Sequence, residues 1–283
     1  MAKAQFSTLE MQDGTRLHCA DYFPSSAPHS AVVFMHGLGE HSGRYEHVAA
    51  FFCAHGYAVR SYDHRGHGKS QGERGDTPHH TALIDDAHAV IRHWQANCPK
   101  SVSRHLLLGH SMGGLFAAKV ALSGSCTLDG LVLSAPALAI RMNVIQRALL
   151  KILSSLAPGL TLSNGLKTTY LSHDPKVIAS YRNDDLVHGR ISARLLNSML
   201  DAMTDVHIRA AALTLPTVLL VAGDDRLVDS SGSLKFAQAC PKNVLRLHTY
   251  ETLYHELFNE FHSSDVFDDV SAWLEQLPAK VAP

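Results

Sequence analysis

Residues 106–122 are "LLLGHSMGGLFAAKVAL", a strand pattern that leads directly into a helix pattern. Between the two lies the motif G-x-S-x-G, from Gly109 to Gly113, with Ser111 at its centre. In such a strand-to-helix turn, side chains at the glycine positions would collide with neighbouring backbone, and the serine is held above the end of the strand. We therefore predict that Ser111 is a nucleophile, against the alternative of a chance match in a glycine-bearing loop.

The rest of the chain repeats this alternation of strand and helix. Short aliphatic runs predict strands at 31–35, 57–62, 105–109, 130–134, 217–222 and 244–250. Helical patterns lie at 44–56, 81–98, 111–124, 230–240 and 263–277. Asp13-Gly14 predicts a hairpin, and so an antiparallel pair at the start of the sheet. The predicted class is α/β, a mostly parallel sheet with helices on both faces.

Residues 141–204 interrupt the strand rhythm and are mostly helical in pattern. We expect them to form a helical cap inserted between two parts of one core, 1–140 and 205–283. The first cap helix carries an apolar stripe of Ile145, Leu149, Ile152 and Leu156. Three interpretations of this stripe are open: it packs on the cap's own core, it lines an acyl tunnel, or it rests on a membrane surface. Ile145 and Leu149 are the candidate substrate contacts, and Pro158-Gly159 is a candidate hinge.

Composition narrows the possible partners. The chain has 283 residues and a formal charge of -1, which argues against nucleic acid as a partner. Its five cysteines lie far apart without C-x-x-C spacing, so we expect reduced thiols rather than disulfides or a zinc site. The sequence lacks an apolar run of the length of a signal peptide or a spanning helix, so we expect a soluble, cytoplasmic protein.

A serine nucleophile needs a base and an orienting acid. Asp225 follows the predicted strand 217–222, and His255 follows the strand 244–250, in the order expected of this fold. Asp224 and Asp229 are alternative acids, or caps of the next helix, and His255 has the alternative of capping the last helix. The oxyanion hole is predicted from two backbone N–H groups, those of Met112 and Leu38.

Five motifs together carry a resemblance: "HGLGEHSGRY", "YDHRGHGKSQG", "GHSMGG", "GDDRLVD" and "YHELFNE". With them the chain resembles the monoacylglycerol lipase family of α/β-hydrolases, also called lysophospholipase-like, from about residue 10 to 277. The resemblance implies the triad Ser111, Asp225 and His255. It also implies Leu38 and Met112 as oxyanion donors, with Leu38 standing where a smaller residue is frequent.

The same resemblance places Glu40 and Arg44 near the glycerol end of a substrate pocket. An ion pair between them that only braces the loop is the alternative. Asp63, Arg65 and His67 are expected to hold a loop together rather than to catalyse.

We therefore expect a serine esterase that cleaves single-chain lipid esters, above all monoacylglycerols, without a metal or an organic cofactor. A lysophospholipase, a short-chain carboxylesterase and an aminopeptidase are alternatives on the same triad. A ligand-binding protein without catalysis is the alternative from another class. The expected partner is a small-molecule lipid ester, with transient membrane contact through the cap, and the oligomeric state is left open.

Overall fold

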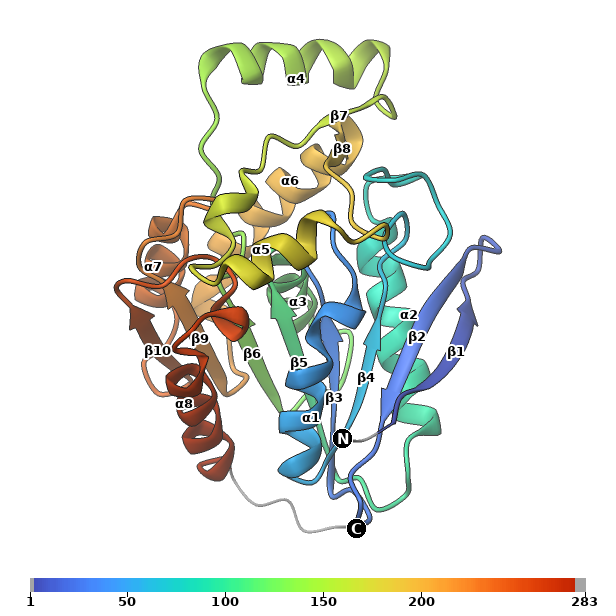
Figure 1. The fold of residues 1–283 in the computed structure, drawn as a ribbon, viewed down its shortest axis with the longest axis vertical. Helices are drawn as coiled ribbons and strands as arrows, with labels where there is room; N and C mark the ends of the chain where they lie inside the picture. The colour runs from blue at the N-terminus through green and yellow to red at the C-terminus, as the bar shows by residue number, and fades with distance from the viewer. Residues whose placement is uncertain (1–2, 278–283) are drawn as a thin grey trace.

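The computed structural model describes residues 3–277. Its centre is an eight-stranded sheet with the order β1-β2-β4-β3-β5-β6-β9-β10 (Figure 1). The strands are Gln5–Glu10 (β1), Arg16–Tyr22 (β2), Ser30–Met35 (β3), Tyr57–Tyr62 (β4), Arg104–His110 (β5), Gly130–Ser134 (β6), Thr217–Ala222 (β9) and Leu245–Tyr250 (β10). The pairs β1·β2 and β2·β4 are antiparallel, and the others are parallel. The predicted α/β class and the hairpin at Asp13-Gly14 are confirmed.

The helices follow the predicted segments closely in the core. They are Glu46–Ala54 (α1), Ala82–Asn97 (α2), Met112–Ser123 (α3), Val144–Leu156 (α4), Pro175–Arg182 (α5), Ala193–Arg209 (α6), Ser230–Ala239 (α7) and Ser263–Glu275 (α8). Short 3₁₀ helices span Ser42–Tyr45 (η1), Thr168–Tyr170 (η2), Ala210–Ala212 (η3) and Leu257–Asn259 (η4).

Two apolar clusters fill the two faces of the sheet. Along β5, Leu107 packs into the cluster with α2, α3, α6 and α7, whereas Leu106 and Leu108 pack into the cluster with α1 and α8. Both faces are therefore buried, which explains the unbroken aliphatic runs. Each leucine fully buried in this way stabilises the fold by about 1.5–3 kcal/mol relative to an exposed one.

The carboxyl ends of the parallel strands meet at one edge of the sheet, below the inserted residues 141–204 (Figure 1). Loops that leave these ends are the usual location of sites in open α/β sheets. Those after β3, β5, β9 and β10 carry the predicted site residues Leu38, Ser111, Asp225 and His255.

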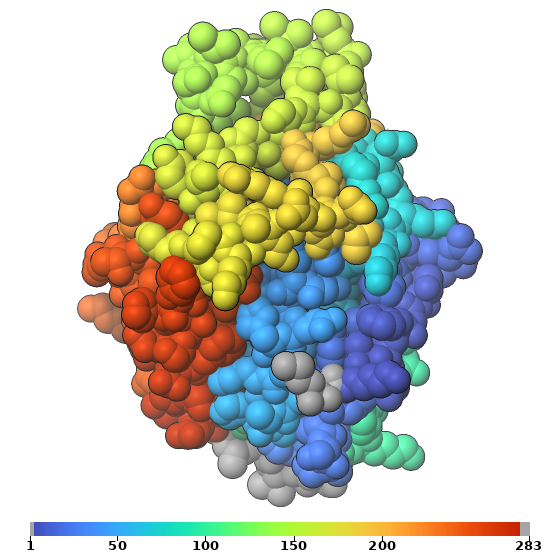
Figure 2. Space-filling model, viewed as in Figure 1, coloured from blue at the N-terminus to red at the C-terminus, as the bar shows by residue number. Residues whose placement is uncertain are grey.

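The inserted segment has more structure than its sequence predicts. Besides α4 and α6 it contains α5 and a two-stranded sheet of Thr161–Ser163 (β7) and Arg190–Ser192 (β8). α6 continues to Arg209, beyond the expected boundary at 204. α4 has no buried residue and stands as a raised block above the rest of the molecule (Figure 2).

Candidate active site

The turn between β5 and α3 is strained in the way that the glycine motif predicts. Ser111 has φ 54° and ψ -120°, a conformation that L-residues rarely adopt. A Cβ on Gly109 would lie 2.4 Å from Gly113 O, and one on Gly113 would lie 2.2 Å from Met35 O. Only glycine fits at either position, so the chain turns sharply and presents the serine hydroxyl.

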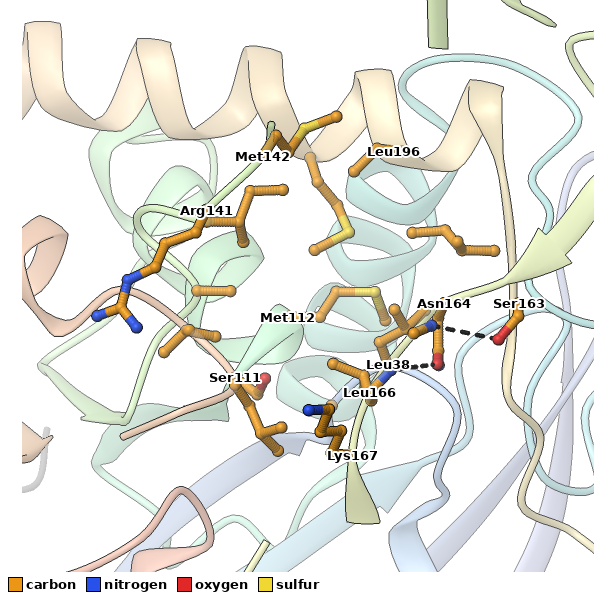
Figure 3. A pocket seen from close by; sticks show the side chains of 18 of the residues that line it. Leu38, Ser111, Met112, Arg141, Met142, Ser163, Asn164, Leu166, Lys167 and Leu196 are labelled. Carbon is orange, nitrogen blue, oxygen red and sulfur yellow. Dashed lines mark hydrogen bonds between the residues drawn. The ribbon is translucent and has the colours of Figure 1, made fainter. Parts of the chain in front are cut away.

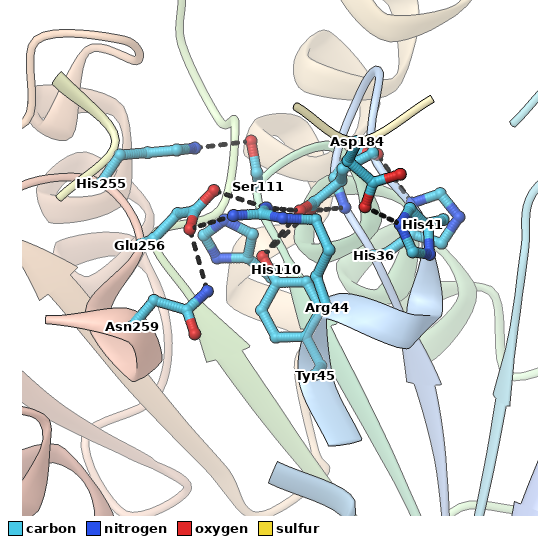
Figure 4. Close-up of polar contacts among 12 residues, drawn as sticks. His36, His41, Arg44, Tyr45, His110, Ser111, Asp184, His255, Glu256 and Asn259 are labelled. Carbon is cyan, nitrogen blue, oxygen red and sulfur yellow. Dashed lines mark hydrogen bonds and ion pairs between the residues drawn. The ribbon is translucent and has the colours of Figure 1, made fainter. Parts of the chain in front are cut away.

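Ser111, His255 and Asp225 form a continuous hydrogen-bonded relay (Figure 4 shows its Ser111–His255 link). Ser111 Oγ lies 2.8 Å from His255 Nε2, and His255 Nδ1 lies 2.7 Å from Asp225 Oδ2. The second carboxylate oxygen of Asp225 accepts the backbone N–H groups of Leu227 and Val228 at 2.9 and 3.0 Å. Because a carboxylate only accepts, the Nδ1 proton of His255 faces Asp225 and Nε2 is free to accept from the serine.

The other two candidate acids lie elsewhere. Asp224 forms a two-point, exposed ion pair with Arg226. Asp229 caps α7 by accepting from Ser231 N, as its alternative interpretation expected. Of the three candidate acids, the one hydrogen-bonded to His255 is Asp225.

The pKa values of His255 and Asp225 shift in opposite directions. Burial alone lowers the pKa of His255, but the carboxylates of Asp225, Glu256 and Glu40 outweigh it and raise that pKa above 6.5. Burial raises the pKa of Asp225, but the imidazole and two backbone donors outweigh it and hold that pKa below 3.8. The His110 ring lies beside that of His255 at a tilt of 54°, with centroids 4.9 Å apart, and burial lowers the pKa of His110 to about 3. The His110 imidazole is therefore neutral beside the His255–Asp225 pair.

The two predicted oxyanion donors flank Ser111. Met112 is the first residue of α3, where backbone N–H groups have no partner within the helix and the dipole favours an anion. Leu38 lies in the loop after β3, and both residues line the same cavity as Ser111 (Figure 3). Both residues therefore lie on the same cavity as the Ser111 hydroxyl.

A cavity of about 470 Å³ adjoins Ser111 and is lined by residues of both α4 and α6 (Figure 3 shows Ser111, Met112 and Leu196 around it). This volume is typical of a small-ligand site. Much of its lining is apolar, including Ile140, Met142, Leu149, Leu150, Leu153, Leu160, Leu162, Leu166, Leu196 and Met199, and it also carries Arg141, Gln146, Asn164, Lys167 and Arg226. Its inner end is polar, with Glu40, Glu256, Tyr181 and His110 near His255. The cavity therefore suits a ligand with one long apolar part and a small polar part.

Two of the four residues predicted to contact substrate line this cavity, and two do not. Leu149 and Glu40 line it. Ile145 does not: its side chain is 79% exposed, because α4 turns Leu149, Leu150 and Leu153 inward and leaves Ile145 on its outer flank. Contrary to the prediction from sequence, the structure places Ile145 outside the cavity.

Arg44 is also absent from the cavity lining among the described residues. Its guanidinium forms ion pairs with the buried carboxylates of Glu40 and Glu256. This arrangement fits the alternative prediction, an intrachain pair that braces the loop. Sequence reasoning missed Glu256 and Tyr181. Glu256 is signalled only by adjacency to His255, and Tyr181 lies in α5, whose Asp174-Pro175 start resembles an N-cap followed by proline.

The "YDHRGHGKS" loop is structural, as expected. Asp63 accepts hydrogen bonds from Ser42 and from Lys69 N. Arg65 makes a two-point ion pair with buried Asp86. These bonds hold the loop without contact to Ser111.

Comparison with known proteins agrees with this fold. A family model described as serine aminopeptidase, S33, matches residues 26–262. A monoacylglycerol lipase of Mycolicibacterium smegmatis is 36% identical over 92% of this chain and 93% of its own length. Phospholipase YtpA of Bacillus subtilis is 30% identical over 88% and 96%. The crystal structure of a monoacylglycerol lipase from Paleococcus ferrophilus superposes with a TM-score of 0.84 at 32% identity, over 93% and 99% of the two chains.

Proposed function

The chain belongs to the serine aminopeptidase S33 family of α/β-hydrolases, and from this premise we propose that it hydrolyses single-chain lipid esters, most readily monoacylglycerols. Its relatives named monoacylglycerol lipase make it a carboxylic ester hydrolase. We assign Ser111 as nucleophile, His255 as general base and acid, and Asp225 as the group that orients the imidazole.

Acylation begins with attack of Ser111 Oγ on the ester carbonyl. His255 Nε2, at 2.8 Å from Oγ, takes the serine proton, and Asp225 stabilises the imidazolium that forms. The N–H groups of Leu38 and Met112 stabilise the oxyanion of the tetrahedral intermediate. Collapse of this intermediate breaks the ester C–O bond, and the leaving alcohol receives the proton from His255.

Deacylation repeats these steps with water in place of serine. His255 removes a proton from water, which attacks the acyl carbonyl in the same oxyanion site. The intermediate then releases the fatty acid, and Ser111 recovers its proton from His255.

Substrate shape follows from the cavity. The apolar residues under α4 suit one long acyl chain, and the polar inner end beside His255 suits a small alcohol with hydroxyl groups. A phospholipase activity on lysophospholipids is the second candidate, favoured by the YtpA relative and by three cations on the cavity lining, Arg141, Lys167 and Arg226.

The cap completes the proposal. We propose that residues 141–204 form a cap domain, and that the outer flank of α4 brings it to a lipid surface. Val144, Ile145 and Leu156 on this helix are 82, 79 and 80% exposed, which is unusual for large apolar side chains. Among residues 3–277, no helix is both long and apolar enough to cross a bilayer.

The observation that carries the proposed function is the Ser111–His255–Asp225 relay at the floor of an apolar cavity. Ser111→Ala should lower ester turnover by on the order of 10⁴ to 10⁶-fold and abolish labelling by a fluorophosphonate probe, while thermal unfolding stays normal. A folded variant with near wild-type turnover would refute it.

A panel of purified substrates separates the candidate activities. It contains monoacylglycerols, lysophospholipids, short p-nitrophenyl esters and peptide amides, each compared by kcat/KM. We expect long-chain monoacylglycerols to rank first. A higher kcat/KM for lysophospholipids or for peptide amides would replace the proposed substrate class.

A further inference from the structure

Three buried ionic side chains connect two loops of the candidate active site (Figure 4). Arg44 donates from Nη1 and Nη2 to the two carboxylate oxygens of Glu256 at 2.7 and 2.8 Å. The same Nη1 donates to Glu40 Oε2. The side chains of Arg44, Glu40 and Glu256 are 9, 4 and 2% exposed, so water does not screen these contacts.

Glu40 carries this connection to the oxyanion loop. Its Oε1 accepts the backbone N–H of Gly37 at 2.6 Å, and Leu38 is the next residue. A Cβ on Gly37 would lie 2.7 Å from Glu40 Oε1 and 3.2 Å from Ser111 Cβ. Gly37 is therefore held closely between the Glu40 carboxylate and the nucleophile.

Glu256 carries the connection to the histidine loop, since it follows His255 directly. Its Oε2 also accepts from Asn259 Nδ2 at 2.9 Å, and its backbone N–H donates to Leu171 O at 2.8 Å. With both carboxylate oxygens and its backbone engaged, Glu256 has little freedom to move. The position of Arg44 thus bears on the position of His255.

We propose that Arg44 is a positioning residue that sets the separation between the Leu38 oxyanion loop and the His255 loop through Glu40 and Glu256. This inference rests on the proposed function, because it assumes that both loops serve ester hydrolysis. Misplacement of reacting groups by about 1 Å can lower the rate by about 100-fold, so such a brace matters to the reaction without contact to substrate.

The role requires an arginine. A planar guanidinium spans two carboxylates with a fixed fork of donors, whereas an ammonium group is a single point. The Arg44 guanidinium also lies over the Tyr181 ring, 4.7 Å from its centroid, which further limits its rotation. Lysine at position 44 would keep the positive charge and lose the two-point contact.

Two other roles for this cluster make different predictions. Glu40 and Glu256 line the cavity, so a contact with the alcohol part of the substrate would affect only esters that carry hydroxyl groups there. A role in stability alone would lower the melting temperature without changing kcat of the folded enzyme.

The test compares Arg44→Lys with wild type on a monoacylglycerol and on a p-nitrophenyl ester of the same acyl chain. We expect kcat to fall by about 10 to 100-fold on both esters, by the same factor, with KM changed less than threefold. Glu256→Gln, which keeps the size of the side chain and removes one of two negative charges, should lower kcat on both esters in the same direction. It keeps the test decisive if Arg44→Lys does not fold.

The matched control is Arg60→Lys on β4, which β3 separates from β5 in the sheet. Arg60 makes a buried two-point pair with Asp21 at 2.7 and 2.6 Å, so the change removes an equivalent interaction and should lower the melting temperature without lowering kcat. A loss confined to the monoacylglycerol, or a kcat unchanged in both Arg44→Lys and Glu256→Gln, would overturn the inference. An inactive wild type or an active Ser111→Ala would instead overturn the proposed function.

Discussion

His36 Nδ1 donates to the carbonyl oxygen of Gly37 over 2.8 Å. The direction of this bond is settled on the other side of the ring, where Nε2 accepts the backbone N–H of His64 at 2.9 Å. Burial lowers the pKa of His36 well below 6.5, so the imidazole is neutral and keeps this tautomer. Because a trans peptide is planar, holding the Gly37 carbonyl also fixes the direction of the Leu38 N–H.

This geometry predicts a catalytic defect in His36→Phe, which keeps a ring and removes both hydrogen bonds. Loss of one oxyanion donor typically lowers kcat by about 10² to 10³-fold, and we expect a loss of about 10 to 10²-fold because the Leu38 N–H is misdirected rather than removed. The measurement is kcat on a p-nitrophenyl ester, corrected for folded enzyme by circular dichroism. An unchanged kcat would show that the loop holds its shape without this ring.

The pH dependence of kcat/KM should report His255. The base must be neutral to accept the serine proton, and its pKa is raised above 6.5 by Asp225, Glu256 and Glu40 against the effect of burial, while neighbouring His110 stays neutral. Activity is therefore complete above that pKa and is lost as the pH falls through it. We expect the midpoint of the acid limb above pH 6.5, and a midpoint near pH 4 would contradict the role of His255.

Asp225→Asn should cause a large loss of kcat, although the side chain keeps its size and shape. An amide NH₂ facing His255 Nδ1 would favour the wrong imidazole tautomer, and a loss of about 10⁴-fold in kcat is expected. Because the Asp225 carboxylate raises the pKa of His255 most, its removal should also move the acid limb of the residual activity to lower pH. Asp224→Asn is the control, since Asp224 is exposed and pairs with Arg226, and its kcat should stay within about twofold of wild type. A large loss in that control would reassign the orienting acid.

The sequence carries enough information for the strands and the sharp turn because these depend on local patterns. The aliphatic run at 106–108 is buried as its pattern predicts, and glycine at 109 is required by the nearby backbone of Gly113. Glycine at 113 is required by Met35 O of the neighbouring strand, but the G-x-S-x-G motif marks it all the same. The role of Arg44 is different. It depends on Glu256, 212 positions away, and only the folded chain brings the two together.

Residues 141–204 show a second limit of prediction from sequence. Helical periodicity correctly groups Ile145 and Leu149 on one side of α4, but it does not say where the edge of the cavity falls within that side. In the structure the edge passes between them, so Leu149 lines the cavity and Ile145 faces outward. Orientation of an inserted helix depends on its connections, and those are outside any local pattern.

The cavity under α4 should set the preferred acyl length. Leu153 lines it, so Leu153→Trp would displace part of a long chain. Each buried CH₂ contributes about 0.8 kcal/mol, so loss of two methylene contacts should lower kcat/KM for long-chain monoacylglycerols roughly 10-fold and leave short esters little affected. Ile208→Trp adds similar bulk at an exposed position near the end of α6, outside the cavity lining, and serves as control. Equal losses on short and long chains would place the acyl chain elsewhere.

The outer flank of α4 should govern binding to lipid. Its exposed side chains at Ile145, Ile152 and Leu156 can each bury apolar surface in a bilayer interface, and replacing all three by serine removes that surface. We expect the fraction of protein that sediments with phosphatidylcholine vesicles to fall by at least about 10-fold. Ile208→Ser removes an equally exposed side chain at 76% exposure, near the end of α6, and should leave sedimentation close to wild type. Among residues 3–277, α4 is the helix that combines several exposed apolar side chains with residues that line the cavity. Undiminished sedimentation of the triple variant, or an equal decrease for Ile208→Ser, would therefore mean that another surface contacts the lipid.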